Sequence, residues 1–229
     1  MDWSPLWISL NTAIPATVLT FFLGVFAAHE NKKLNHKLAQ LVDVLLTLPL
    51  VLPPTVMGFL LLQLLGKNGL LGKPMMSIGI QLVFTRSAAI IAAIVVSFPL
   101  MYRSAKAAFE QVDQNLIYAA RTMKLSELQI FWRVIMPIAL PGVASGTILA
   151  FARALGEFGA TLMIAGNIPG KTQTMPLAIY MAIQSGEDKE AFYWVVLLII
   201  LSFLMILTMN GFAKKGTTNR KEEKHESDG

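Results

Sequence analysis

Five stretches of the sequence are apolar over roughly the length of a membrane-crossing helix, and they constrain the fold more than any other feature. Residues 6–28, 44–66 and 191–213 contain no charged residue. About 20 apolar residues in a helix cross the ~30 Å hydrocarbon core of a bilayer. The run at 87–102 is shorter, but arginines at both ends can extend to the membrane surface. With a further run from 134, we predict an all-α, polytopic membrane helix bundle of about five transmembrane helices.

The composition supports a membrane protein. Hydrophobic residues make up 55% of the chain and charged residues only 14%, whereas a soluble domain carries about 25% charged residues. One membrane domain is expected to cover residues 1–213, with transmembrane helices at about 6–28, 41–66, 84–106, 134–164 and 191–213. The segment 214–229 is polar and of mixed charge, so we expect a disordered tail there.

Lysine and arginine are distributed unevenly between the two sides of the membrane. With the N-terminus outside, 13 of the 19 basic residues fall in cytoplasmic segments and five in external ones. Cytoplasmic loops of membrane proteins carry such an excess. We therefore predict that Met1 lies outside and Gly229 in the cytoplasm. The net charge of +5 is then dispersed over three loops, which argues against nucleic acid as a partner.

The sequence offers no candidates for a catalytic centre or a metal site. It contains no cysteine, and its three histidines lie far apart without ligand spacing. No Ser-His-Asp or paired-carboxylate arrangement falls within a membrane run. Residues 165–172 nearly match a phosphate-binding loop, but that loop requires a preceding strand in an α/β sheet. We therefore expect that the chain is not an enzyme.

The longest cytoplasmic segment, about 107–133, is predicted to form a helix, a turn and a second helix. Asp113 can cap a helix that runs to about Met123. Ser126 and Gln129 have the spacing of a capping box, which predicts that the second helix begins there and continues into the membrane. The apolar positions of the first helix are Leu116, Ala120 and Met123.

This segment resembles the coupling loop of ABC importer permeases, which reads Glu-Ala-Ala-x3-Gly-x9-Ile-x-Leu-Pro. The chain keeps Ala119, Ala120 and Pro137, and it has Tyr118 for the Glu and Lys124 for the Gly. Glycine permits a left-handed turn that costs other residues about 1–3 kcal/mol. We therefore expect the turn between the two helices to differ from that of the family.

Other segments resemble one branch of that family. Residues 48–58 and 97–101 are similar to segments of molybdate permease subunits, and residues 149–161 and 166–172 to molybdate and sulfate permeases alike. Five spans in about 230 residues fit the shorter, molybdate type. Sulfate, thiosulfate or tungstate remain alternative substrates. A stand-alone secondary transporter is a less favoured alternative, since it would be expected to show internal repeats.

The resemblance implies a set of partners. The chain would form a homodimer in the bacterial inner membrane, with the pathway at the dimer interface and alternating access to its two sides. Two copies of a cytosolic ATP-binding subunit, which would hold ATP and magnesium, would dock on the coupling loops, and no cofactor would bind this chain. A separate extracytoplasmic protein would deliver the oxyanion. The implied coupling residues are Asp113, Tyr118, Ala119, Ala120, Arg121, Lys124, Ser126 and Pro137.

Arg153 and Glu157 lie four residues apart in the fourth predicted span, on one helix face. Inserting one ionisable residue near the bilayer centre costs ~2.5–3.5 kcal/mol on insertion scales. Two opposite charges that lie side by side partly neutralise each other and lower this cost. Two interpretations stay open. The pair either pins the helix against a neighbour, or it lines the pathway of an anion.

Small residues and prolines mark two further features of the spans. Gly142, Gly146, Ala150 and Ala154 recur every four residues, which predicts close helix packing within the subunit or across the dimer. A proline inside a membrane helix frees a backbone carbonyl from its hydrogen bond. This is tolerated where neighbouring protein or a water-filled cavity satisfies the carbonyl. We predict kinks, and a gate, at Pro49, Pro53 and Pro54. In the predicted external loop, Lys171, Thr172 and Gln173 are candidates for contact with the delivery protein or the oxyanion.

Overall fold

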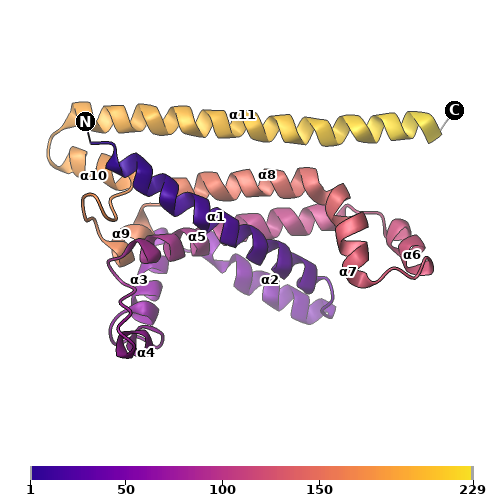
Figure 1. Cartoon of the computed structure of the whole chain (residues 1–229), viewed down its shortest axis with the longest axis horizontal. Coiled ribbons are helices and arrows are strands. Elements are labelled where there is room, and N and C mark those ends of the chain that lie inside the picture. The colour runs from indigo at the N-terminus through magenta and orange to yellow at the C-terminus, as the bar shows by residue number, and fades with distance from the viewer. Residues whose placement is uncertain (1, 228–229) are drawn as a thin grey trace.

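The computed structural model describes residues 2–227, with side chains described as far as residue 208, and all regular structure in this range is helical (Figure 1). Four helical segments are long and apolar enough to cross a membrane, and a bent pair makes a fifth candidate. The four are α1 (Ser4–Asn31), α5 (Arg86–Glu110), the continuous stretch of α7, η1 and α8 (Glu127–Leu155), and the first part of α11 (Asp188–Ser227). The predicted all-α membrane bundle is therefore confirmed.

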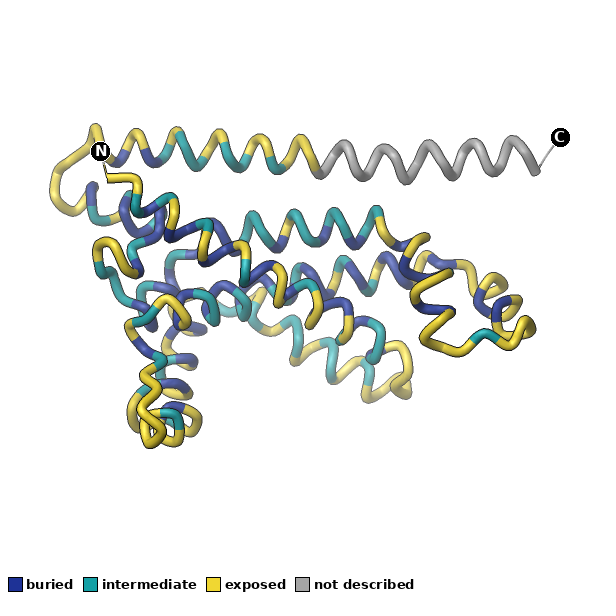
Figure 2. The backbone as a smooth tube through the Cα atoms, viewed as in Figure 1, coloured by how far each residue is buried: buried dark blue, intermediate teal, exposed yellow. Residues whose placement is uncertain are grey.

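The core of the bundle is formed by α1, α5 and α8, which pack against one another along their lengths. Figure 2 shows buried residues running along all three. Their contact positions are mostly small, as at Ala16 and Ala92, so the helix backbones approach closely. Between α1 and α5 the buried hydroxyls of Thr20 and Ser97 lie 3.3 Å apart, which satisfies polar groups away from water.

The second predicted span, 41–66, is not one straight helix. It consists of α2 (His36–Val51) and α3 (Pro54–Leu65), which are bent by 111°. A residue before proline is pushed out of the helical region, and here Leu52 and Pro53 are both extended, with ψ of 139°. The predicted kink therefore lies at Pro53 and Pro54, whereas Pro49 is accommodated inside α2.

The fourth predicted span, 134–164, is also interrupted. Helix α8 (Met136–Leu155) ends before Gly156, and a separate short helix, α9 (Gly159–Ala165), follows. At its other end α8 is preceded without a break by α7 (Glu127–Ile130) and a π-helical turn, η1 (Phe131–Ile135). The helical stretch that begins after Ser126 therefore continues without a break to Leu155, and it ends short of residue 164, the predicted end of the span.

Two short helices had no counterpart in the sequence-based prediction. They are α4 (Gly72–Ser77) and α10 (Met175–Gln184), and α10 lies in the predicted external loop. Pro176 in its first turn and the apolar run that follows are signals that could have revealed it. Residues 214–227, where a disordered tail was predicted, form the end of helix α11, and residues 228–229 lie outside the described range.

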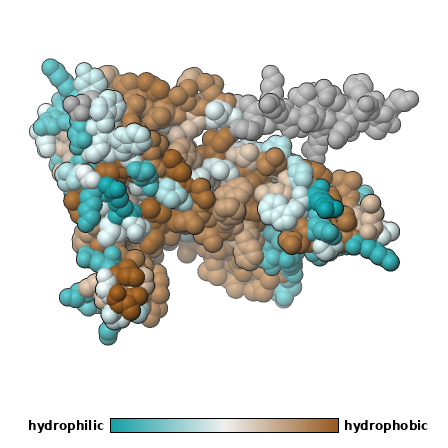
Figure 3. Space-filling model, in the orientation of Figure 1, coloured by the Kyte–Doolittle hydropathy of each residue, from teal (hydrophilic) through white to brown (hydrophobic). Residues whose placement is uncertain are grey.

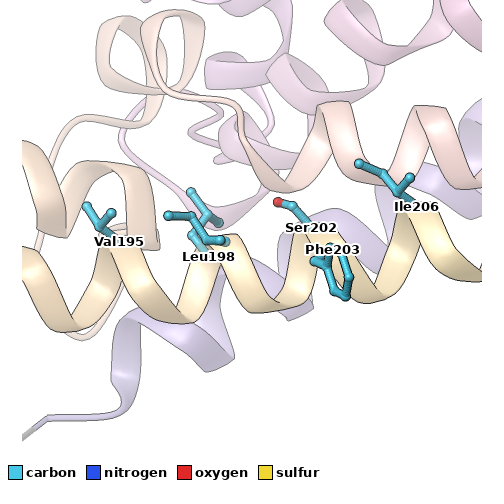
Figure 4. A pocket seen from close by; sticks show the side chains of 6 residues that line it. Val195, Leu198, Ser202, Phe203 and Ile206 are labelled. Atoms are coloured by element: carbon cyan, nitrogen blue, oxygen red, sulfur yellow. The ribbon is translucent and has the colours of Figure 1, made fainter.

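The surface of the bundle fits a membrane environment. Figure 3 shows hydrophobic residues over the middle of the visible body and hydrophilic residues gathered towards its two ends. Helix α11 is held at its start by Trp194, which is fully buried and lies edge-on to Trp3. Further along α11 there is an open groove of ≈ 370 Å³ (Figure 4). It is lined by Val195, Leu198, Ile199, Ser202, Phe203 and Ile206. These uncharged side chains suit lipid chains and not an anion.

Candidate functional site: the helical loop and the broken helices

The predicted loop projects from one end of the bundle as α6 (Gln114–Thr122), a turn and α7 (Figure 1). The Asp113 carboxylate accepts a hydrogen bond of 2.8 Å from the Asn115 N–H at the start of α6. At the start of α7 the Ser126 hydroxyl accepts from the Gln129 N–H, and the Gln129 side chain accepts from the Ser126 N–H. Both helix starts thus follow directly from local capping chemistry.

The orientation of α6 differs from the predicted one. Ile117 and Ala120 are buried in the core cluster that includes Phe109 and Phe131. Leu116 and Met123, which the periodicity placed on the same face as Ala120, are exposed. The exposed side of α6 therefore presents Leu116, Tyr118, Ala119 and Met123. An apolar surface on a loop outside the bundle is typical of a site that another protein covers.

The turn between α6 and α7 has the left-handed conformation that glycine favours, although Lys124 occupies it. Lys124 has φ of 59°, which is the backbone conformation that a glycine would adopt without strain. Arg121 and Glu127 bridge the turn, with Nε–Oε1 and Nη2–Oε2 distances of 2.8 and 3.2 Å. This bidentate contact raises the pKa of Arg121 and helps to hold a turn that Lys124 alone would disfavour.

Replacing Lys124 by glycine should stabilise the protein. A non-glycine residue in the left-handed region costs about 1–2 kcal/mol, while glycine adds backbone entropy to the unfolded chain, so we expect a net gain of about 1 kcal/mol. Thermal unfolding of the purified protein in detergent measures it. Met123→Gly is the matched control, because Met123 has φ of −76° and gains nothing from glycine. Equal shifts for both variants would contradict the prediction.

The two broken helices contact each other through α3 and α9. A Cβ atom placed on Gly159, at the start of α9, would lie 2.9 Å from the Pro54 Cβ at the start of α3. One placed on Gly58 would lie 2.7 Å from the Met163 Cβ and 2.9 Å from the Ala160 Cα. Helices α3 and α9 are therefore packed backbone to backbone. Broken membrane helices are found where non-helical backbone is covered by protein or lines an aqueous cavity.

Arg153 and Glu157 form an ion pair at the second of these breaks. Arg153 Nη2 lies 2.8 Å from Glu157 Oε2, and the Glu157 side chain is only 2% exposed. Glu157 follows the end of α8, so the pair joins the last turn of α8 to the break. The other carboxylate oxygen of Glu157, Oε1, accepts a hydrogen bond of 2.8 Å from the Ala160 N–H in the first turn of α9. This geometry favours the pinning interpretation, because Glu157 fixes both helix ends.

The stripe of small residues on α8 lies against α5 of the same chain. A Cβ atom on Gly146 would lie 2.4 Å from the Ser104 Cβ, and one on Gly142 would lie 2.7 Å from the Ala108 Cβ. Ala150 and Ala154 continue the stripe and are buried. The α5–α8 contact thus places the last turns of α5 and the coupling-loop end of α8 in one rigid unit.

The predicted contact residues of the external loop have different surroundings. Thr172 is fully buried, where its hydroxyl accepts from the Ile168 N–H at 3.0 Å, so it is not available to a partner. Lys171 is exposed and Gln173 half-buried. Arg86, at the start of α5, donates to the carbonyls of Gly170 and Lys171 at 3.1 and 3.0 Å. Arg86 therefore ties this loop to the central helix.

A polar cluster between α2 and α5 had no counterpart in the sequence-based prediction. The Asp43 carboxylate accepts hydrogen bonds from the Tyr102 hydroxyl and from Lys106 Nζ, the latter at 2.6 Å. Asp43 is the sole charged residue between Lys37 and Lys67. That isolation was the available signal, since a lone carboxylate in an apolar span requires a partner.

A membrane bundle with two broken helices in contact, and with a capped helical loop at one end, defines a polytopic membrane transport subunit. The chain belongs to the family described as the binding-protein-dependent transport system inner membrane component, whose model matches residues 20–214. Members of this family work with an ATP-binding subunit and a substrate-binding protein, and the chain is a multi-pass inner membrane protein.

Individual relatives of the chain show which members of the family it resembles. The chain is 43% identical over 205 residues to the putative molybdenum transport system permease protein YvgM of Bacillus subtilis, covering 89% of this chain and 90% of the relative. It is 39% identical over 215 residues to the molybdenum transport system permease protein ModB of Escherichia coli K12, covering 93% and 94%. An inward-facing structure of the MetNI methionine ABC transporter matches in fold, with a TM-score of 0.72, 19% identity, and 94% and 97% coverage.

Proposed function

We propose that this chain is the permease subunit of an ATP-driven importer that carries molybdate across the inner membrane. The observation that carries the proposal is the 43% and 39% identity, over about nine tenths of each chain, to proteins named as molybdenum transport permeases. The fold supplies what transport requires, because broken helices within the bundle offer backbone groups where a polar solute passes. Tungstate and sulfate share the tetrahedral oxyanion chemistry and are the alternative substrates.

The pathway is proposed to lie between two copies of the chain. Val51, beside the break, is 82% exposed, and the outer faces of α2 and α3 are apolar. A second copy that covers these faces would enclose the break region between the subunits. The extended residues Leu52 and Pro53 are suited to act as a hinge. Alternating access would then consist of opening this region first to one side of the membrane and then to the other.

ATP is proposed to bind two copies of a separate subunit, which hold the magnesium as well. The exposed residues of α6 form the docking surface, and Arg121, Lys124 and Ser126 fix the turn beneath it. This end of the bundle would face the cytoplasm, with Met1 outside and Gly229 inside. On the outer side, Lys171 and Gln173 remain candidates for contact with the oxyanion-binding protein.

Reconstitution tests the proposal. We expect uptake of labelled molybdate into proteoliposomes that contain this chain with its ATP-binding subunit, when the binding protein and ATP are supplied on the appropriate sides. Excess unlabelled tungstate or sulfate is added in separate experiments. The extent to which each reduces the uptake of labelled molybdate ranks the three oxyanions as substrates. ATP hydrolysis by the purified chain alone, or uptake without the ATP-binding subunit, would contradict the proposal.

Ala119→Asp should uncouple the permease from its ATP-binding subunit. Ala119 is exposed on α6, and an unpaired carboxylate buried under a partner costs about 1–3 kcal/mol, which corresponds to roughly 5- to 150-fold weaker docking. Co-purification with the ATP-binding subunit and molybdate uptake should both fall.

Gln111→Asp adds the same charge at an exposed position before α6 and should leave both measurements unchanged. Ala120 is unsuitable for this purpose, because it is 5% exposed and its replacement would test folding. Normal uptake by the Ala119→Asp variant would place the docking surface elsewhere.

A further inference from the structure

Helix α2 is attached to its subunit differently from the other long helices. In α2, all of which the structure describes, no residue is fully buried, whereas α1, α5 and α8 each bury a row of residues. Its polar side-chain link to α5 is Asp43, which accepts from Tyr102 with one carboxylate oxygen and from Lys106 with the other. Leu46 adds an apolar contact with the core cluster that includes Tyr102. The hydrogen-bonded attachment of α2 to α5 therefore depends on one carboxylate.

Helix α2 is tethered at one end and has an extended, hinge-like break at the other, so it can pivot relative to the bundle. At one end, Leu52 and Pro53 are extended and lead to α3 through the bend of 111°. Helix α3 itself is fixed on α9 by the close approach at Gly58. At the other end, a short connection joins α2 to α1, where the Asn31 side chain donates to the Ala39 carbonyl at 3.1 Å. A swing of α2 would thus be absorbed by the extended residues and would leave α3 in place.

The partners of Asp43, by contrast, are held rigidly. Tyr102 is fully buried, and its ring stacks on Phe98 with an interplanar angle of 11°. Lys106 lies one turn further along α5, which is the central helix of the bundle. The donors lie on the central helix of the bundle, while the acceptor lies on a helix that buries no residue within its own subunit, so a movement of α2 away from α5 would break both hydrogen bonds together.

A polar pocket lies where α2 and α5 face each other. Its volume is ≈ 490 Å³, and Asp43 and Thr47 of α2 and Arg103, Lys106, Ala107 and Glu110 of α5 contribute to its lining. Four of these side chains are charged, which is incompatible with exposure to lipid hydrocarbon. The pocket is therefore open to water, at the end of the bundle that carries α6, and its size depends on the distance between α2 and α5.

We propose that Asp43 is a latch that holds α2 against α5 in one state of the transport cycle and releases it in the other. The proposal rests on the proposed transport function, to which it adds the residue that couples the hinge at Leu52 and Pro53 to α5. The Asp43–Lys106 contact is intact in the structure described here, which therefore represents the latched state. Release widens the pocket and lets α2 pivot.

Cysteine labelling tests the latch, because the chain contains no cysteine of its own. Ala107→Cys places a thiol in the pocket of the full transporter complex in proteoliposomes. Its reaction with a membrane-impermeant maleimide should differ between the nucleotide-free and the vanadate-trapped states by about tenfold, the equivalent of one charge-assisted hydrogen bond. Adding Asp43→Asn should make labelling fast in both states.

Thr47→Val is the matched control. Thr47 lines the same pocket, but its hydroxyl donates within α2, to the Asp43 carbonyl at 2.7 Å. It should keep the difference between states. The exchanged pair Asp43→Lys with Lys106→Asp should restore that difference, which a general loss of folding in Asp43→Asn would not explain.

The latch would be overturned if the Ala107→Cys protein were labelled at the same rate in both nucleotide states. It would also be overturned if the rate still differed between the states after Asp43→Asn was added. Because labelling is read without transport, this result is separate from the proposed function, which fails if the wild-type complex takes up no molybdate.

Discussion

Replacing Glu157 by alanine should lower the free energy of unfolding by about 1.5–3 kcal/mol, because the variant loses a buried charge-assisted hydrogen bond and an ion pair to a half-buried arginine. The Glu157 carboxylate binds Arg153 with one oxygen and the Ala160 N–H with the other. Its loss leaves the half-buried Arg153 without its partner and uncaps α9. Since α9 packs on α3 at the first helix break, we expect transport to fall together with stability.

Two variants separate the contributions of charge and capping. Glu157→Gln keeps an oxygen that can accept from Ala160 and removes the charge, so its loss should be smaller than that of alanine. Glu187→Ala removes an exposed carboxylate from the turn before α11 and should change stability by less than about 0.5 kcal/mol. Thermal unfolding in detergent compares all three. An alanine variant as stable as the wild type would mean that the pair does not pin the helix ends.

Replacing Gly146 by leucine should prevent correct packing of α8 on α5. Even a Cβ atom at this position would lie 2.4 Å from the Ser104 Cβ, so the helices must separate. Overpacking of a tight core usually costs about 1–3 kcal/mol, and a full leucine side chain between two backbones should reach about 3 kcal/mol or more. The yield of folded protein and its unfolding temperature measure the effect.

Gly146→Ala and Gly156→Ala form a matched pair for the same test. At Gly156 the nearest atom to an added Cβ is the Ala152 carbonyl oxygen at 3.5 Å, which is an ordinary contact. We therefore expect alanine to destabilise the protein at Gly146 and to be tolerated at Gly156. If alanine were tolerated equally at both positions, the α5–α8 contact would have to be looser than the structure indicates.

The spans themselves could be predicted, because the bilayer imposes a simple length and polarity requirement on the chain. The residues at which the spans end were harder to predict. Arg153 and Glu157 gave the expected pair, but the sequence did not show that α8 ends at Leu155, since residues 158–164 are as apolar as a continued helix would be. The 111° bend at Leu52 and Pro53 was predicted as a kink without its size, because proline limits the local backbone but neighbouring helices decide the direction.

Local chemistry explains which parts of the candidate site were foreseen. Asp113 and Ser126 cap helices through bonds to residues two or three positions away, so their roles can be read from the order of residues alone. The same holds for the stripe on α8, whose close packing follows from the small size of its residues. Capping and size, however, do not reveal which helix the stripe meets, or which side of α6 is turned to the core.

The sequence by itself determined that the protein lies in a membrane, roughly where its long apolar segments lie, and where its helical loop begins. Those properties depend on hydrophobicity and on bonds between near neighbours. Only the tertiary structure decided that Ala120 is buried while Ala119 is exposed. The same is true of the left-handed turn that Lys124 adopts and of the meeting of Asp43 with Tyr102 and Lys106. The reason is physical. The burial of Ala120 and the contacts of Asp43 depend on residues distant in the chain, and at Lys124 the Arg121–Glu127 contact across the turn outweighs the local preference of lysine.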